Sequence, residues 1–386
     1  MKLHVLSIPH TITSEDYLSC AFTQKVLKFC KMMTPYYSII HYGHENSDVI
    51  CHEHVSVIDD HILKETYGEY DWKSEFFKHN VDDLAHRTFN ENAKYELVNR
   101  VEEGDAVLCF WGKGVANATS AVTDKSFIIE PGIGYKAEGV FAPFKIFESY
   151  SHMHRIYGSL GIKYGQLYDA VIPNYFDVSN FEYTNNKQDY FLFLSRMTKD
   201  KGLTIAIEAT RHLGCQLVVA GQGSFEHLGY DSIPQHVDFV GFADLSTRKE
   251  LMKNAKALLL PSLYLEPFGG VIVEAMLSGT PVITSDWGAF SENNLHGITG
   301  FRCRSDEHFL WALKNIEKIN PETCRQWAEK NFSLEKVATM YDEYLQNLKT
   351  NFFHNNQIVD SMSLALYRKE LNWLERTYPN AKGNII

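Results

Sequence analysis

The feature that most constrains the fold is a set of short, almost wholly apolar segments that alternate with helical stretches. In the second half of the chain these segments are YFLFLS, CQLVVAGQG, VDFVGF, ALLLPS and PVITSD. A strand that is apolar on both faces has to be covered on both faces, which is typical of a parallel sheet between two layers of helices. Stretches such as GLTIAIEATRHLG and residues 246–255 have the helical period that this cover requires.

The first half of the chain follows the same pattern less regularly. KLHVLSIP is an expected first strand, a helix is expected through about Met33, and DAVLCF, SFIIEPG, KIFESY and YDAVIP are expected later strands. PNYFDVSNFEYTNNKQDY then breaks the periodicity and is typical of a connector between domains. We therefore predict an α/β fold of two doubly wound, Rossmann-like domains that face each other across a cleft. They span 1–175 and 188–350, and 351–386 is predicted to be a helical extension that packs back on the first domain.

The composition supports this division and excludes several classes of protein. A length of 386 residues favours two domains, and 45% hydrophobic with 22% charged residues is ordinary for a globular protein. The formal net charge of −11 argues against nucleic acid as a partner. We find no apolar stretch long enough to span a bilayer and no signal peptide at the start. Seven cysteines without framework spacing indicate reduced thiols and a cytoplasmic location.

The segment LYLEPFGGVIVEAMLSGTPVITSD, residues 263–286, places two acids around a pair of glycines at the start of an expected helix. Gly269 and Gly270 allow a ligand to approach the backbone, and the amide groups there and at Val271 favour an anion. A phosphate at this position would have Glu266 on one side and Glu274 on the other. Because carboxylates repel phosphate, the two acids are expected to bind hydroxyl groups of the same ligand. The plainer alternative is a loop acid and a helix-surface acid without a ligand.

Two cations come before this segment, at the end of an earlier strand. FLSRMTKDKG places Arg196 and Lys201 between that strand and the next helix, where they would neutralise a diphosphate. The alternative is a solvated basic turn. LVVAGQGS adds a glycine turn with Gly221 after the following strand, and this turn alone is weak evidence for a binding site.

Taken together, these segments resemble the donor half of the retaining glycosyltransferases of family four, over about residues 190–300. The resemblance implies the GT-B architecture, a nucleotide-diphosphate sugar as donor, no bound metal and no cofactor. It also implies that Glu266 is catalytic and contacts the transferred sugar, that Glu274 contacts the ribose, and that Arg196 and Lys201 bind the diphosphate. A uridine diphosphate hexose is the default donor, and a glycan, a protein-linked glycan or another hydroxyl compound is the expected acceptor. The oligomeric state is left open.

The first half resembles this family only in outline. PHTITSEDYLSC stands where the family usually has a glycine-rich loop, so Thr11, Thr13 and Ser14 are candidates to supply hydroxyl groups there. IIEPGIGY, with Glu130, occupies the place after the fifth strand where the family often has a histidine. We predict Glu130 and His152 on the acceptor side of the site.

Other interpretations of the sequence stay open. A nucleotide-sugar epimerase shares this architecture, and an inactive nucleotide-sugar-binding relative would keep it without catalysis. CHEHVSVID, with Cys51, His52 and His54, suggests a metal site, but no second cluster at ligand spacing follows. A polar edge strand is the simpler interpretation of that segment.

Overall fold

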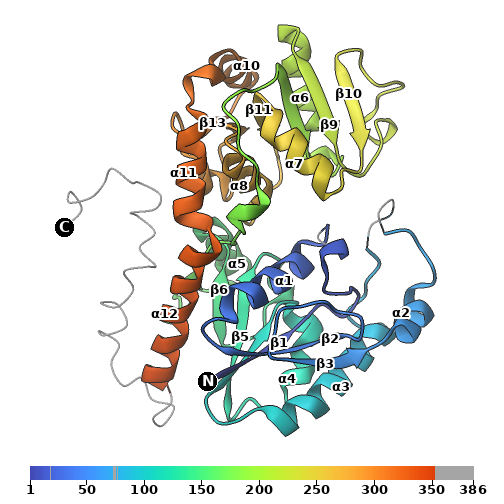
Figure 1. Ribbon diagram of the computed structural model, residues 1–386, viewed down its shortest axis with the longest axis vertical. Helices are drawn as coiled ribbons and strands as arrows, with labels where there is room; N and C mark the ends of the chain where they lie inside the picture. The colour runs from blue at the N-terminus through green and yellow to red at the C-terminus, as the bar shows by residue number, and fades with distance from the viewer. Residues whose placement is uncertain (18, 73–74, 76, 353–386) are drawn as a thin grey trace, which may run out of the picture. The chain divides into compact units, whose positions relative to one another are not determined.

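The computed structural model describes residues 1–17, 19–72, 75 and 77–352, and it divides into two compact units (Figure 1). The first unit comprises Met1–Tyr175 and the long helix that begins at Leu334, and the second comprises Phe176–Ser333. Each unit has its own sheet and its own core, as the sequence predicts. All seven cysteines are free thiols. Within the described ranges, no helix combines the length and the apolar character needed to cross a membrane.

The first unit is built on a seven-stranded parallel sheet with the order β3-β2-β1-β4-β5-β6-β7. The strand order reverses at β1: the chain first adds β2 and β3 on one side of β1, and it then adds β4 on the other side. The strands are β1 (Lys2–Leu6), β2 (Ser38–His44), β3 (Glu53–Ile58), β4 (Asp105–Cys109), β5 (Ser126–Ile133), β6 (Phe144–Phe147) and β7 (Ala170–Val171). The helices are α1 (Ala21–Met33), α2 (Asp60–Tyr67), α3 (Leu84–Arg100), α4 (Ala116–Thr119), α5 (Tyr150–Leu160) and α12 (Leu334–Phe352).

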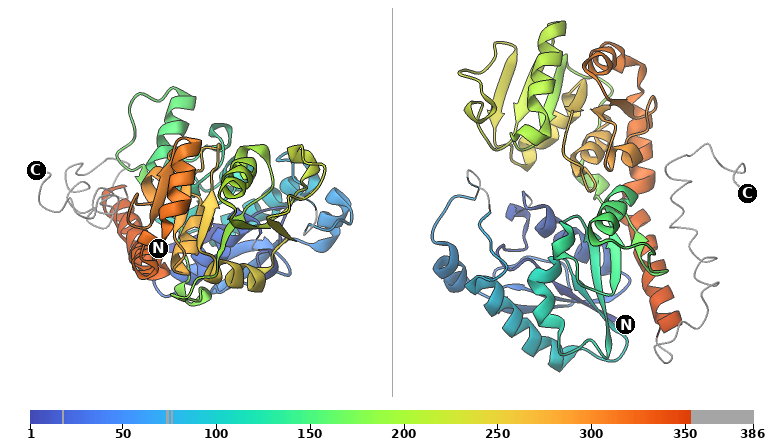
Figure 2. Two further views of the ribbon diagram at one scale, coloured as in Figure 1. Left: turned by 90° about the horizontal axis from the view of Figure 1, so that it is seen from above. Right: turned by 180° about the vertical axis from the view of Figure 1, so that it is seen from behind.

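Helices cover both faces of this sheet because its strands are apolar on both sides. Ala106 and Leu108 of β4 pack in the cluster that contains α1 and α12. Val107 and Cys109, the alternate residues of the same strand, pack in the cluster that contains α3, the cyan helix in Figure 2. This alternation is the period of two that a strand imposes on its side chains. β3 lies at the edge of the sheet, so the simpler interpretation of CHEHVSVID as a polar edge strand is confirmed.

The second unit is built on a six-stranded parallel sheet with the order β10-β9-β8-β11-β12-β13, and this order reverses between β8 and β11. The strands are β8 (Tyr190–Leu194), β9 (Gln216–Ala220), β10 (Val237–Gly241), β11 (Ala257–Leu260), β12 (Val282–Ser285) and β13 (Gly300–Cys303). The helices are α6 (Leu203–Leu213), α7 (Leu245–Asn254), α8 (Gly270–Leu277), α9 (Phe290–Asn293), α10 (Asp306–Asn315) and α11 (Pro321–Phe332).

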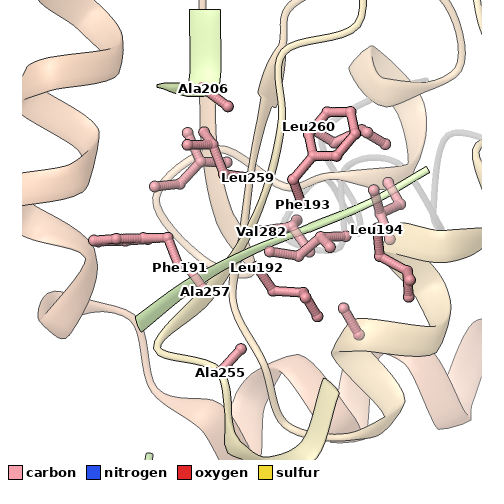
Figure 3. Close-up of a cluster of buried hydrophobic side chains, with 14 of the residues drawn as sticks. Phe191, Leu192, Phe193, Leu194, Ala206, Ala255, Ala257, Leu259, Leu260 and Val282 are labelled. Atoms are coloured by element: carbon pink, nitrogen blue, oxygen red, sulfur yellow. The ribbon is translucent and has the colours of Figure 1, made fainter. Parts of the chain in front are cut away.

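The core of the second unit explains why its apolar segments are strands. Phe191, Leu192, Phe193 and Leu194 of β8 are all buried, and they pack with residues of β11, β12 and α6 (Figure 3). A strand buried on both faces lies in the middle of a sheet, between two layers of helices. Both predicted Rossmann-like domains are therefore confirmed, and their arrangement across a cleft stays a prediction.

The boundaries of the domains differ from the prediction at two places. The second unit ends at Ser333 rather than at 350, because α12 packs into the core of the first unit. Tyr341 of α12 meets Phe29 of α1 edge to face, with ring centroids 5.2 Å apart. The second unit also begins earlier than 188, since the amide of Phe176 donates to the carbonyl of Phe332 at 2.8 Å. The predicted extension over 351–386 lies almost wholly outside the described residues.

Candidate functional site

The candidate site of the second unit lies where its strand order reverses. The loops after β8 and β11 meet at this point, and ligands of open α/β sheets bind at such positions. Gly202 makes the meeting possible: it has φ of +74°, and a Cβ there would lie 2.0 Å from the carbonyl oxygen of Pro261. Only glycine fits this backbone contact. It brings Lys201, the residue before it, next to the loop that follows β11.

Glu266 is held by two groups that contact the same carboxylate oxygen. The ammonium nitrogen of Lys201 lies 2.5 Å from Oε1 of Glu266, and the hydroxyl of Ser262 donates to the same Oε1 at 3.1 Å. Lys201 and Glu266 are 8% and 9% exposed, so solvent does little to weaken their attraction. Oε2 of Glu266 has no hydrogen-bond partner within the described part of the chain. That oxygen is an acceptor next to the ammonium group of Lys201.

Glu274 is held in the same way by a residue that the sequence interpretation missed. Nη2 of Arg248, on α7, lies 2.5 Å from Oε2 of Glu274, which is on α8 and only 7% exposed. Oε1 of Glu274 makes no hydrogen bond to any residue that the structure describes. The two partners are 26 residues apart in sequence and on different helices. No spacing rule for a single helix would have paired them.

The amino end of α8 has no side chain as a cap. The helix begins at Gly270 after Gly269, whose φ is +76° and whose side-chain position is filled by the Phe290 ring, 2.4 Å from an added Cβ. The amides of Gly270 and Val271 donate to no acceptor among the described residues. Unpaired amides and the helix dipole together favour an anion. Pro267 precedes the helix and is not part of its first turn.

The remaining predicted donor residues lie on neighbouring strand ends. Arg196 is exposed on the loop after β8, five residues before Lys201. Gly221 follows β9, with φ of +150°, and a Cβ there would lie 1.9 Å from the carbonyl oxygen of Ser195. The glycine turn therefore brings the ends of β8 and β9 together. Phe268 packs in the core against Phe176.

In the first unit, the predicted place of Glu130 after the fifth strand is wrong. Glu130 lies inside β5 and is fully buried. Its carboxylate accepts from the hydroxyl of Tyr135 at 2.6 Å and from the amides of Phe141 and Ala142 at 3.0 and 2.8 Å. Burial raises the pKa of Glu130 to about 7, although these donors oppose the shift. Glu130 therefore stabilises the chain segment between β5 and β6 through these hydrogen bonds.

His152 also makes internal contacts. It lies on α5 and is 2% exposed, and its Nε2 is 2.9 Å from the carbonyl oxygen of Tyr135. Because a carbonyl can only accept, Nε2 carries a proton, and burial lowers the pKa of His152 to about 4. Nδ1 of His152 is a buried acceptor with no partner among the residues described. Nearby sequence gave no sign of the buried ion pair between Lys25 and Glu148.

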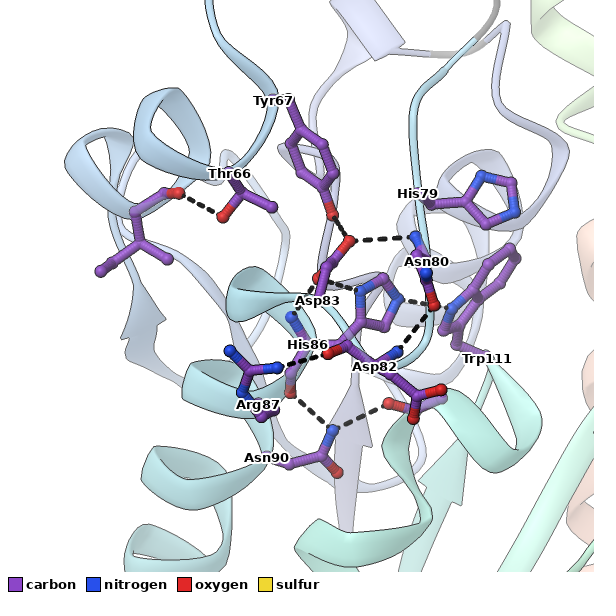
Figure 4. Close-up of polar contacts among 12 residues, drawn as sticks. Thr66, Tyr67, His79, Asn80, Asp82, Asp83, His86, Arg87, Asn90 and Trp111 are labelled. Atoms are coloured by element: carbon purple, nitrogen blue, oxygen red, sulfur yellow. Dashed lines mark hydrogen bonds and ion pairs between the residues drawn. The ribbon is translucent and has the colours of Figure 1, made fainter.

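Three histidines of the first unit gather around Trp111, which lies just beyond the end of β4, and Figure 4 shows part of this cluster. His10 follows β1, His79 precedes α3, and His86 lies on α3. Nδ1 of His86 lies 2.8 Å from Asp83, and the indole of Trp111 donates to Nε2 of His86 at 3.0 Å. These partners fix His86 as neutral, with its proton on Nδ1. His10 stacks on His79 with ring centroids 4.8 Å apart, and burial lowers the pKa of His10 well below its ordinary value. His10 and His86 are therefore neutral side chains that lie among other aromatic rings.

Among the described residues, one group has the spacing of metal ligands: His44, Glu45 and Asp60, whose ligand atoms lie within 4.8 Å of one another. The amide of Asn46 donates to Nδ1 of His44 at 3.1 Å, so the proton of the neutral ring is on Nε2. Nε2 lies 3.3 Å from Asp60 without a hydrogen bond to it, and the proton that Nε2 carries occupies the position a metal ion would need. His52 accepts from the backbone in the same way, which removes it as a ligand.

Comparison with known protein families identifies the second unit. Residues 177–333 match the family model described as "Glycosyl transferases group 1". An uncharacterized glycosyltransferase of Methanocaldococcus jannaschii is 36% identical over 172 residues, which cover 39% of this chain and 44% of that protein. A glycogen synthase of Mycobacterium tuberculosis is 36% identical over 166 residues, covering 38% and 40%. This chain thus spans less than half the length of the curated relatives that it matches.

Solved structures resemble the chain over most of its length. HepE of Anabaena, solved in complex with UDP and glucose, has a TM-score of 0.63 and 16% identity over 90% of this chain and 99% of its own. Sucrose-phosphate synthase of Thermosynechococcus elongatus has a TM-score of 0.63 and 16% identity over 91% and 100%. At this identity the likeness concerns the fold, and it agrees with two Rossmann-like domains. The match over residues 177–333, and not the likeness in fold, assigns the second unit to the glycosyl transferases group 1 family.

Proposed function

We propose that this chain is a retaining glycosyltransferase that transfers a hexose from a nucleotide-diphosphate sugar to a hydroxyl acceptor. One observation carries the proposal: Glu266 and Glu274 each have one oxygen held by a cation and the other oxygen uncommitted. Two such acceptors on either side of an uncapped helix end suit a ligand with hydroxyl groups at both ends of an anion. A nucleotide-diphosphate sugar has this pattern, with ribose, diphosphate and sugar in that order.

The cations and the helix end would bind the diphosphate and stabilise it as it leaves. A lysine has three donors, so Lys201 is able to hold Glu266 and still donate to a phosphate oxygen. Arg196 and the amides of Gly270 and Val271 add donors, and Gly221 lets the backbone approach the ligand. Negative charge grows on the leaving phosphate as the bond to the sugar breaks, and fixed donors stabilise that charge. Glu266 would face the sugar, where positive charge develops.

The comparisons support a nucleotide-sugar donor and leave the sugar and acceptor to be proposed. HepE was solved with UDP and glucose, and one matching relative of 33% identity over 147 residues is a phosphatidyl-myo-inositol mannosyltransferase of Mycolicibacterium smegmatis. A uridine diphosphate hexose is our default donor. A glycan, a protein-linked glycan or another hydroxyl compound is the proposed acceptor, bound by residues 1–175. Catalysis without a metal or cofactor and a cytoplasmic location stay predictions.

A two-step experiment tests the proposal. First, a thermal-shift screen of nucleotide sugars identifies the donor, because a ligand that binds only the native state raises the melting temperature. Second, saccharide acceptors are added with that donor, and release of free nucleoside diphosphate is measured. Acceptor-dependent release is the expected result. Conversion of the sugar without release would indicate an epimerase, and binding without either reaction would indicate an inactive relative.

A further inference from the structure

Glu274 needs a counter-charge that its own helix does not supply. It is the fifth residue of α8 and is 7% exposed. The favourable effect of a helix dipole on an acid falls off within the first turn, so it does little for Glu274. A buried carboxylate without a partner is costly. Arg248 is the cation that meets this need, at 2.5 Å.

The position of Arg248 is poor for its own helix, which indicates that its task lies elsewhere. It is the fourth residue of α7, near the amino end, where the helix dipole is unfavourable for a cation. The first turn of α7 is nevertheless well fixed: Asp244 accepts from the amides of Thr247 at 2.8 Å and Arg248 at 2.9 Å. A fixed helix end therefore presents the guanidinium to a carboxylate on another helix.

The contact between these side chains uses only one oxygen of the carboxylate. Nη2 of Arg248 binds Oε2 of Glu274, and Oε1 is left without a partner in the described part of the chain. An arginine that held both oxygens in a fork would leave fewer acceptor sites for a ligand. The observed contact instead fixes the rotation of the carboxylate and leaves Oε1 as a directed acceptor.

We propose that Arg248 is a positioning residue for nucleotide binding, which aims Oε1 of Glu274 at a ribose hydroxyl. This inference rests on the proposed function, because it assumes a nucleoside diphosphate in the site. Without Arg248, the Glu274 carboxylate would rotate and turn to solvent or to other donors. The site would then lose its preference for a ligand with ribose hydroxyls. Arg248 would then determine how strongly the site distinguishes ribose from deoxyribose, without touching the nucleotide.

The test measures UDP, 2′-deoxy-UDP, 3′-deoxy-UDP and pyrophosphate by calorimetry with wild type and Arg248→Ala. We expect Arg248→Ala to weaken UDP about tenfold, since a hydrogen bond to a charged group is lost or misdirected. At least one deoxy analogue and pyrophosphate should change less than twofold, so that the discrimination between ribose and deoxyribose collapses. An equal loss for UDP and both deoxy analogues would overturn the proposal. If wild type binds neither UDP nor another nucleoside diphosphate, the proposed function itself fails.

Three further variants separate positioning from general damage. Arg248→Lys keeps the charge and should restore part of the discrimination, and Lys249→Ala on the same helix should leave it unchanged. Arg248→Ala in a Glu274→Gln background should have no additional effect on UDP, because both changes act through one carboxylate. A further loss in that background would mean that Arg248 contacts the nucleotide directly or supports the fold, and either result rejects the positioning role. The double variant also avoids a buried unpaired acid, so it stays measurable if Arg248→Ala unfolds.

Discussion

In the first unit the strand order reverses between β1 and β4, and in the second unit it reverses between β8 and β11. We call the carboxyl ends of these strands the first edge and the second edge, and their side chains differ in kind. Glu266 and Glu274 in the second unit each keep one oxygen uncommitted beside a cation. Glu130 in the first unit has both oxygens occupied by internal donors, and the histidines His10 and His86 are buried and neutral. The same sheet topology thus carries two different sets of side chains at the two places where the strand order reverses.

The largest expected effect tests whether the second edge binds a diphosphate. In the variant Arg196→Ala with Lys201→Ala, two charge-assisted hydrogen bonds to phosphate would be lost, at about 1.5–3 kcal/mol each. We therefore expect the affinity for UDP to fall by roughly 100-fold or more, while the affinity for uridine changes little. Calorimetry with both ligands measures the difference. An equal loss for uridine and UDP would contradict the assignment of these cations to the diphosphate.

Lys201 has a second task, and this prediction needs a control for it. Removing Lys201 leaves Glu266 buried without its cation, and the unpaired charge could repel phosphate by itself. The variant Lys201→Ala with Glu266→Gln removes both charges. If its affinity for UDP returns to the wild-type value, the loss in Lys201→Ala reflects repulsion by Glu266 and not a missing contact to phosphate.

The second prediction concerns the stability of the first unit in acid. Burial lowers the pKa of His41 to about 3 and of His152 to about 4, and it lowers the pKa of His10, His44, His54 and His86 as well. In the second unit the pKa of His296 is lowered by burial. The unfolded chain binds more protons than the native state below about pH 6.5, so stability falls as pH decreases from there. His41 alone would contribute about 2 kcal/mol of loss at pH 5.

Glu130 acts in the opposite direction. With a native pKa of about 7, it binds a proton in the folded state between about pH 4.5 and 7, when the unfolded state has lost it. It therefore offsets part of the histidine effect in acid, and its contribution is lost as pH rises through about 7. The histidines that are buried in the first unit outnumber this single group, so net destabilisation in acid is expected there.

Native-state hydrogen exchange at pH 7 and pH 5, corrected for intrinsic exchange rates, reports the two units separately. Peptides from β1 and β2 should lose more protection free energy than peptides from β8 and β9. His41→Gln should reduce the difference between the two units in lost protection free energy. His61→Gln, at a side chain that is 82% exposed, is the matched control. Equal losses in both units would remove this distinction between them.

The third prediction separates the two glutamates of the second edge. Glu274 would face ribose, where the contact scarcely changes during the reaction, so Glu274→Gln should mainly raise the KM for the donor. Glu266 would face the sugar, where charge develops, so Glu266→Gln should mainly lower kcat. Each effect should be about tenfold, since one charge-assisted hydrogen bond is weakened. Steady-state kinetics with the identified donor measures both values.

Free nucleoside diphosphate provides the control, because it has ribose and lacks the sugar. Its affinity should fall in Glu274→Gln and stay unchanged in Glu266→Gln. Wild-type affinity in both variants would mean that Glu274 does not contact ribose. A loss in Glu266→Gln alone would mean that the donor is bound in the opposite direction.

The sequence predicted the positions of the second unit's candidate residues in the fold well, because these positions are determined locally. The spacing of Glu266, Gly269, Gly270 and Glu274 within one strand–loop–helix unit already places them at one end of a helix, and the structure agrees. Arg248 was missed because its contact with Glu274 joins two helices, and such a contact depends on how α7 and α8 pack. The pairing of Lys201 with Glu266 also depends on packing, through the backbone contact at Gly202.

The sequence predicted the first unit less well. The predicted strand SFIIEPG is observed as β5, but the placement of Glu130 after that strand was wrong, because β5 includes Glu130 and continues through Ile133. The end of the second domain was misplaced because the helical period of 334–352 is the same whichever core it packs in. The contact of Tyr341 with Phe29, more than 300 residues away, decides that question.

The smallest expected effect tests whether either edge depends on a metal ion. Among the described residues, only His44, Glu45 and Asp60 have ligand atoms within 4.8 Å of one another, and they belong to the first unit. The amide that donates to Nδ1 of His44 leaves the proton on Nε2, so a metal ion would have to displace that proton and the contact with Asp60. In the second unit, the cations at Lys201 and Arg248 already neutralise the two glutamates.

Treatment with a chelator should therefore change the transferase rate by less than about twofold, and added Mn²⁺ or Mg²⁺ should not raise it further. The measurement is the rate of nucleotide release before and after dialysis against the chelator, with Asp60→Asn treated in parallel. Activity that vanishes and returns only with a divalent ion would contradict a metal-independent reaction. In that event the parallel variant decides the location: if Asp60→Asn keeps the metal response, the ion acts with the nucleotide and not at β2. If the response is lost, the first unit holds a metal site that the proton on His44 argues against.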